Sequence, residues 1–318
     1  MKKEKYFLKK LSISRFFDSD LFYSFSHSPI SIIAGIITVI FFLASLFAPW
    51  ITPQNPFDMA SIDVLDSFIP PIWELDGDER FLLGTDDQGR GILSTIIHGS
   101  RISLFIGFSS VIFAMILGVF LGLVSGFIGG ILDAFIMRVA EIQLSFPAIL
   151  IALLVNGILR GILPADQHDS MAYYVLVLSI GISGWVQYAR TVRGSTMVER
   201  NKEYVQAARV IGIHPFMIMF KHILPNVMSP VLVIATIHLA VAIITEATLS
   251  FLGVGIQPPT ADWGSMVREM AGLIQFAEFD TQAAITPLLP AAAIAILTVA
   301  VNFIVDWFLH KTSGLKDE

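Results

Sequence analysis

Six long apolar stretches follow one another along the chain, separated by segments rich in polar and charged residues. A helix needs roughly 20 apolar residues to cross a bilayer core of about 30 Å. The third stretch is long for one span and the fourth is the shortest. The pattern predicts an all-α polytopic membrane protein with six transmembrane helices. The expected spans are 29–50, 102–124, 132–159, 173–189, 227–251 and 284–309.

The composition excludes the main alternatives to a membrane protein. Of the 318 residues, 55% are hydrophobic and 14% are charged, whereas a soluble domain carries about 25% charged residues. The mean hydropathy is +0.74. A soluble globule of this composition would leave large apolar patches in water, so a soluble enzyme or a disordered protein is excluded. Cysteine is absent, which removes disulfides, thiolate zinc sites and iron–sulfur clusters.

Lys and Arg residues indicate the orientation of the chain in the membrane. Of 20 such residues, 14 lie in the segments before span one, between spans four and five, and after span six, and Arg138 at the start of span three brings that side to 15. Because cytoplasmic loops are enriched in Lys and Arg, both termini and the 190–226 loop are expected in the cytoplasm. The 51–99 loop is then external. It holds nine acidic residues, and we interpret it as mostly solvated.

Residues 1–28 precede the first span and mix Phe and Leu with Lys9, Lys10 and Arg15. This mixture is typical of an amphipathic segment that lies in the cytoplasmic interface. The segment is too long and polar for the start of a signal peptide, so the first span, 29–50, is expected to be an uncleaved helix. At the other end, residues 310–318 are expected to form a cytoplasmic tail.

The 190–226 loop carries the most specific pattern in the sequence. Glu203 stands where an acid favours the first turn of a helix, and two small alanines follow it. Gly212 is placed to end this helix with a positive φ, and Pro215 to begin the next one. A short helix, a tight turn and a second short helix are therefore predicted at the cytoplasmic face. The residues that define the loop are Glu203, Ala207, Ala208, Gly212, Pro225 and Asn226.

This spacing, Glu-x-x-x-Ala-Ala-x-x-x-Gly followed by Ile-Leu-Pro, resembles the EAA loop of ABC-importer permease subunits. Other segments resemble the dipeptide/oligopeptide, or DppC/OppC-like, branch of that family, and the likeness runs from about residue 29 to 308. Phe81-Leu82 replaces the usual His-Pro, and the usual C-terminal ending is also different. The segments that carry the likeness are 83–90, 99–104, 126–138 and 250–264.

The resemblance implies a type I ABC-importer permease fold, with a core at 100–309 that contains five transmembrane helices and the 190–226 coupling loop. It implies a location in the bacterial cytoplasmic (inner) membrane and three kinds of partner. These are a homologous second permease subunit, two cytoplasmic ABC ATPases that contact the coupling loop, and an extracytoplasmic solute-binding protein. Nucleic acid is not expected among the partners. The implied substrates are di- or oligopeptides, with nickel or another small solute as the alternative.

Nothing in the sequence predicts a catalytic, cofactor or metal site. The phosphate-binding pattern Gly-x-x-x-x-Gly-Lys-Ser/Thr is absent, since none of the nine lysines follows a glycine. The chain is therefore expected to be a transport subunit and no enzyme, with ATP bound and hydrolysed by partner subunits.

Three acidic residues lie inside expected spans, where charge is costly and often functional. Glu246 lies in the fifth span, Glu141 in the third and Asp306 near the inner end of the sixth. Glu246 and Glu141 are candidates for the translocation path. The alternative, which we favour for both, is a polar contact that pairs helices, and Glu246 is expected to face protein rather than lipid.

One function from another class also has a sequence basis. Gly181-Ile-Ser183-Gly in the fourth span matches the Gly-x-Ser-Gly of rhomboid-type intramembrane proteases, and His238 lies in the fifth span. A Ser–His pair could perform acyl transfer. However, the second span contains no His or Asn to match the further group of those proteases, and small residues within spans usually serve helix packing.

The predicted topology can be tested by labelling, because the chain contains no cysteine. We expect Asp76→Cys to react with an impermeant thiol reagent added to intact cells. Lys202→Cys should react only after the membrane is broken. The reverse pattern would overturn both the charge argument and the cytoplasmic assignment of the 190–226 loop.

Overall fold

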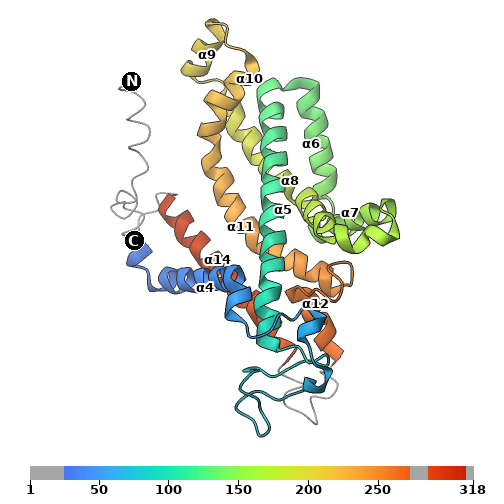
Figure 1. The fold of residues 1–318 in the computed structure, drawn as a ribbon. Helices are drawn as coiled ribbons and strands as arrows, with labels where there is room; N and C mark the ends of the chain where they lie inside the picture. Colours follow the sequence, from blue (N-terminus) through green and yellow to red (C-terminus); the bar gives the residue numbers. More distant parts are fainter. Residues whose placement is uncertain (1–24, 273–285, 313–318) are drawn as a thin grey trace, which may run out of the picture.

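The computed structural model describes residues 25–272 and 286–312, which are mostly helical (Figure 1). Short 3₁₀ turns η1 (Met59–Ser61), η2 (Val64–Asp66) and η3 (Ala165–Gln167) and a π-helical segment, η4 (Ile218–Ile223), join the main helices. The α-helices are α4 (Pro29–Ile51), α5 (Ile92–Ile128), α6 (Gly130–Leu144), α7 (Ala148–Ile162), α8 (His168–Glu199), α9 (Glu203–Val210), α10 (Pro215–Met217), α11 (Leu224–Phe251), α12 (Trp263–Ala271) and α14 (Leu288–Thr312).

The described helices confirm the prediction of an all-helical membrane protein. Five helical segments are long and apolar enough to span a membrane, and a bent pair of helices makes up to six. The helices extend beyond the apolar stretches, because polar residues at their ends continue the same hydrogen-bonded turns. Thus α8 runs from His168 to Glu199, whereas 173–189 was expected. The five straight segments are Pro29–Ile51, Ile92–Ile128, Ala165–Glu199, Pro215–Phe251 and Leu288–Leu309.

The third expected span, 132–159, is not one straight helix. It consists of α6 and α7, which meet at an angle of 102°. The break falls at Ser145-Phe146-Pro147, where Pro147 takes the N-cap position of α7. A proline disfavours helical backbone in the residue before it, so Phe146 cannot readily continue α6. Hydropathy alone does not detect this bend, because both halves remain apolar.

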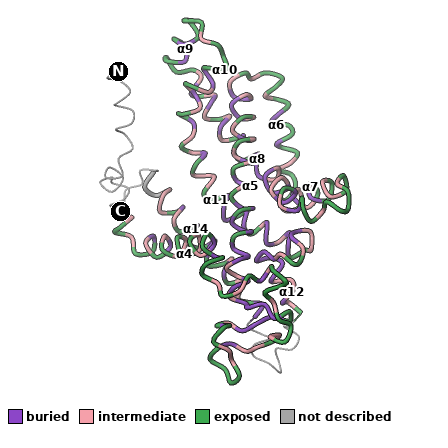
Figure 2. Tube along the Cα trace, in the orientation of Figure 1, coloured by how far each residue is buried: buried purple, intermediate pink, exposed green. Residues whose placement is uncertain are grey.

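The backbones of α5 and α8 come into close contact along three turns of α5. A Cβ added to Gly122 would lie 2.6 Å from the carbonyl oxygen of Ala189, and one added to Gly126 would lie 2.8 Å from that of Arg193. At Gly118 the carbonyl oxygen of Trp185 is nearer still. Small residues at every fourth position let membrane helices pack tightly. Figure 2 shows the buried residues of the two helices gathered along this contact.

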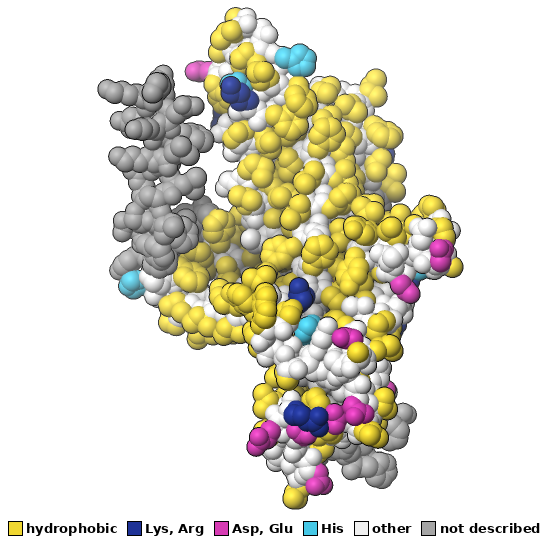
Figure 3. All heavy atoms as spheres, in the orientation of Figure 1, with side chains coloured by type: hydrophobic (Ala, Val, Ile, Leu, Met, Phe, Trp, Pro, Cys, Tyr) yellow, Lys and Arg dark blue, Asp and Glu magenta, His cyan; other side chains and the backbone are white. Residues whose placement is uncertain are grey.

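The two informative loops lie at opposite ends of the long helices α5, α8 and α11 (Figure 1). One end carries α9 and α10, and the other carries the 52–91 segment and α12. Between these ends the visible surface is mainly hydrophobic, and acidic side chains gather on the end formed by the 52–91 segment (Figure 3). This distribution suits helices that cross a bilayer with polar loops on both sides.

The 52–91 segment is more ordered than the expected solvated loop. Arg90 and Asp86 are both 2% exposed, and the Arg90 guanidinium donates to Asp86 at 2.6 Å and to Glu269 of α12 at 3.0 Å. Burial by itself would lower the pKa of Arg90, but the attraction of the Asp86 and Glu269 carboxylates is together larger and raises it. A buried charge is costly unless it is paired, so this ion-pair network fixes the segment against α12.

Several expectations concern residues outside the described part of the chain. The amphipathic segment 1–28 is described only from Phe25 onward, and the tail 310–318 only to Thr312. Residues 310–312 continue α14 as helix, so the last helix extends into the expected tail.

We expect a larger side chain in the α5–α8 contact to destabilise the protein. Gly122→Leu should lower the free energy of unfolding by about 1–3 kcal/mol, because the helices must separate to admit the side chain. Gly194→Leu, on α8, is the matched control, since a Cβ there meets nothing within 4 Å. Thermal unfolding of the purified protein in detergent provides the comparison. Equal unfolding temperatures for the two variants would contradict this account.

Candidate functional site

The expected loop 190–226 is shorter in the structure, because residues 190–199 continue α8 as helix. The remainder, with α9, α10 and η4, forms a compact hairpin at the end of the molecule. Helix α9 begins at Glu203, which lies in its first turn as expected. Gly212 has a φ of 82°, which confirms the predicted left-handed turn. Pro215 is the first residue of α10, again as predicted. Pro225 lies within the first turn of α11, and η4 joins α10 to α11, so no break separates the second short helix from the fifth span.

Apolar packing holds α9 against the ends of the long helices. Val205 and Ala208 are buried in one cluster with Ile218 and Ile223 of η4. The two expected small residues therefore differ: Ala207 is exposed, whereas Ala208 is 4% exposed and supports the hairpin from within.

The outer side of the hairpin is apolar and open. Val210 is 88% exposed and Ile211 77% exposed, and Phe216 and Met217 beside them are more than half exposed. We call these four residues the apolar tip. Figure 3 shows hydrophobic side chains at this end of the molecule, next to basic and histidine side chains. Val210 and Ile211 precede the candidate span Pro215–Phe251, and Phe216 and Met217 lie at its start. A cluster of exposed apolar side chains at the end of a helix bundle is typical of a protein contact.

A polar network beneath the tip joins three helices. The Tyr204 hydroxyl donates to Glu199 of α8 at 2.6 Å, and the Asn226 amide of α11 donates to the same hydroxyl at 3.0 Å. Burial, followed by the bond to Glu199, raises the pKa of Tyr204 to about 12. Asn226 belongs to the predicted loop pattern, whereas Tyr204 and Glu199 do not. The sequence did offer a signal for Tyr204: it is a tyrosine among charged and small residues, directly after the charged end of α8.

Ion pairs and hydrogen bonds connect the α5–α6 turn to the C-terminal end of α8, next to the hairpin. Arg193 binds Asp133 of α6 with two nitrogens, one of them at 2.7 Å, and Ser125 also donates to Asp133. Arg200 donates to the carbonyl oxygen of Gly126 at 2.8 Å. These contacts hold together the ends of α5, α6 and α8 that lie next to the hairpin.

The two path candidates occupy different environments. Glu246 is 0% exposed at the junction of α11 and α12, which confirms that it faces protein. Ser250 donates to Asp262, the N-cap of α12, at 2.7 Å and lies 3.4 Å from Glu246. Glu141 is exposed on α6 and pairs with the equally exposed Arg138 at 3.3 Å. The structure therefore does not bring Glu246 and Glu141 together.

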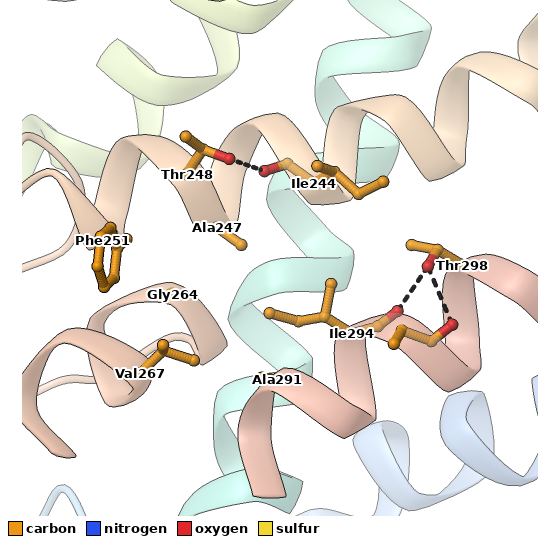
Figure 4. A pocket seen from close by; sticks show the side chains of 10 residues that line it. Ile244, Ala247, Thr248, Phe251, Gly264, Val267, Ala291, Ile294 and Thr298 are labelled. Atoms are coloured by element: carbon orange, nitrogen blue, oxygen red, sulfur yellow. Dashed lines mark hydrogen bonds between the residues drawn. The ribbon is translucent and has the colours of Figure 1, made fainter. Parts of the chain in front are cut away.

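A pocket of about 430 Å³ is lined by residues such as Ala247, Phe251 and Ile294 (Figure 4), and Glu246 is not among its lining residues. Helices α11, α12 and α14 line it with mainly apolar side chains. The hydroxyls of Thr248 and Thr298 point back to carbonyl groups of their own helices, at 2.7 and 2.8 Å, so they are already paired. Within residues 25–272 and 286–312, no group of three or more His, Asp or Glu side chains could hold a metal ion.

Ser183 and His238 do not form a catalytic pair in this structure. The Ser183 hydroxyl donates to the carbonyl oxygen of Ile180 at 2.7 Å. His238 instead lies 3.0 Å from the Tyr188 hydroxyl through Nδ1 and packs on Gly184. Both residues thus serve helix packing, and the acyl-transfer hypothesis lacks the Ser–His contact that it requires.

Two family models match the chain. Residues 118–311 match "binding-protein-dependent transport system inner membrane component", and residues 18–71 match "N-terminal TM domain of oligopeptide transport permease C". A structure of the MetNI methionine ABC transporter in an inward-facing conformation has a TM-score of 0.50 and 21% identity, and the match covers 69% of this chain and 97% of that one. This last likeness concerns the fold alone.

Curated relatives extend the match to most of the chain. The di/tripeptide transport system permease protein DppC of Pseudomonas aeruginosa is 35% identical, over 92% of this chain and 88% of the relative. The oligopeptide transport system permease protein OppC of Bacillus subtilis is 35% identical, over 82% of this chain and 79% of the relative. The chain thus belongs to the family of binding-protein-dependent transport system inner membrane components.

Proposed function

We propose that this chain is a permease subunit of an ATP-driven importer of di- or oligopeptides, and that its 190–226 loop couples the ATPases to the membrane helices. The observation that carries the coupling assignment is the apolar tip on a rigid hairpin, at the end of the molecule opposite the acidic external segment. The peptide assignment rests on the relatives, whose names specify di/tripeptide and oligopeptide transport.

The arrangement explains how the subunit would act without chemistry of its own. Two ATPases in the cytoplasm bind the apolar tips of this chain and of a homologous second permease, and a solute-binding protein docks outside. ATP-driven closure of the ATPases moves the hairpins. Because α8 and α11 begin or end at the hairpin, its movement shifts the helices between inward-open and outward-open states. Each state is favoured by its own set of contacts, as coupling requires.

Three supports favour the hairpin as the ATPase contact. The exposed side chains of Val210 and Ile211 can enter an apolar groove. Gly212 fixes the turn between the two short helices, and its surroundings are open, because a Cβ there meets nothing within 4 Å. Glu203 and Ala207 remain on the accessible part of α9.

A charge in the apolar tip should prevent ATPase binding. Ile211→Asp places a carboxylate where the partner offers apolar surface, and we expect the ATPase to bind at least about tenfold more weakly. Val64→Asp is the control, because Val64 is similarly exposed, at 72%, at the opposite end of the molecule. Co-purification from membranes and ATP hydrolysis by the reconstituted complex measure the effect. Normal ATPase binding by Ile211→Asp would refute the docking assignment.

The substrate assignment can be tested by growth. Deletion of this subunit should abolish growth on a di- or oligopeptide supplied as the sole source of a required amino acid. Nickel-dependent enzyme activity should be unchanged in the same strain. If deletion removed nickel uptake and left peptide use intact, the peptide assignment would be wrong and the nickel alternative would replace it.

A further inference from the structure

Tyr204 links the coupling hairpin to both membrane helices that meet there. It lies in the first turn of α9, while Glu199 is the last residue of α8 and Asn226 lies in the first turn of α11. The single Tyr204 hydroxyl contacts both, at 2.6 Å and 3.0 Å. One phenol oxygen therefore joins three helices whose relative movement defines coupling.

The hydroxyl of Tyr204 has two possible acceptors, Glu199 at 2.6 Å and the carbonyl oxygen of His222 at 3.4 Å, and the shorter contact is the stronger one. A tyrosine hydroxyl has one proton to donate and can also accept. Glu199 takes the proton, and the hydroxyl accepts from Asn226. The second hydrogen of the Asn226 amide goes to the carbonyl oxygen of His222, at 2.7 Å. A phenol is protonated at neutral pH, since its ordinary pKa is about 10, so the hydroxyl can donate to the Glu199 carboxylate.

Other contacts also connect the hairpin to the helices: Lys202 pairs with Glu199 at 2.7 Å, and the Arg209 guanidinium lies over the Phe127 ring of α5. Lys202 and Arg209 are exposed, so water weakens both contacts. The backbone route from α9 to α11 passes the left-handed turn at Gly212 and the π-helical segment η4, and π-helical segments are rare departures from the regular α-helix. The packing of Val205 and Ala208 is apolar. It opposes separation of α9 from the bundle, but apolar contacts do not fix the orientation of α9. The bond to Glu199 is directional and charge-assisted, and such bonds are the stronger kind.

We propose that Tyr204 is the positioning residue that transmits movement of α9 to α8 and α11. This inference rests on the proposed coupling role of the 190–226 loop. Within that loop, it identifies the contacts of the Tyr204 hydroxyl as those that transmit movement. The apolar tip binds the ATPase, and the phenol prevents the docked hairpin from moving without the helices. Loss of the hydroxyl should therefore leave docking intact while ATP is hydrolysed with less import.

The test is Tyr204→Phe in the complete transporter, reconstituted in vesicles with its ATPases and binding protein. We expect the ATPases to co-purify as with the unmodified chain, and peptide import per ATP hydrolysed to fall about fivefold or more. The control is Tyr174→Phe, which removes the hydroxyl of a 65% exposed tyrosine near the other end of α8. Import per ATP should not change in this control.

Variants of Glu199 separate the hydrogen bond from the charge. Glu199→Ala removes the acceptor and should lower import per ATP as Tyr204→Phe does, while Glu199→Gln keeps an acceptor oxygen and should restore most of it. Lys202→Ala removes the exposed partner that contacts Glu199 at 2.7 Å, but leaves the phenol bond, so its effect should be small. Combining Tyr204→Phe with Glu199→Ala should be no worse than either change alone, because both break one interaction.

The outcomes distinguish this inference from the function on which it rests. Unchanged import per ATP in Tyr204→Phe, with the ATPases bound, would overturn the inference alone. Loss of ATPase binding in Tyr204→Phe would also overturn it, because the hydroxyl would then serve docking rather than transmission. Normal ATPase binding by Ile211→Asp would instead refute the proposed coupling function.

Discussion

The close approach of α5 and α8 is the constraint on which the rest of this structure depends. Lipid offers helices no hydrophobic gain on association, so membrane helices rely on close packing and on polar contacts. Gly118, Gly122 and Gly126 let the two backbones meet. With these helices packed closely, the C-terminal end of α8 is fixed relative to the α5–α6 turn, and Asp133 comes within reach of Arg193. The α9–α10 hairpin is built on this fixed end.

Ion pairs and hydrogen bonds connect the helices at both ends of the bundle, where water replaces lipid. At the end that carries the 52–91 segment, Arg90 bridges Asp86 and Glu269, and Ser250 joins α11 to the N-cap of α12. At the opposite end, Arg193 and Tyr204 connect α6, α8, α9 and α11. Directional contacts at the ends and apolar packing between them suit helices that move as rigid units between two states.

The hairpin combines an exposed apolar surface with hydrogen bonds that connect it to the membrane helices. In the proposed coupling role, exposed apolar side chains such as Ile211 would provide non-directional contact area for the ATPase, while the hydrogen bonds of Tyr204 connect α9 to α8 and α11. The sequence pattern found the hairpin but not this connection. Glu203 and Gly212 are recognisable because helix starts and left-handed turns require particular residue types, whereas the partners of a tyrosine hydroxyl depend on which distant residues fold beside it.

The sequence by itself determined the helical membrane architecture, the opposite placement of the two polar loops, the positive φ of Gly212 and the membership of the permease family. Each depends on local composition or on spacing along the chain. Only the tertiary structure decided that 132–159 bends at Pro147, that Ala208 turns inward while Ala207 stays exposed, and that Tyr204 meets Glu199 and Asn226. The bend leaves hydropathy unchanged, and the other two features arise from packing between segments that the sequence does not place side by side.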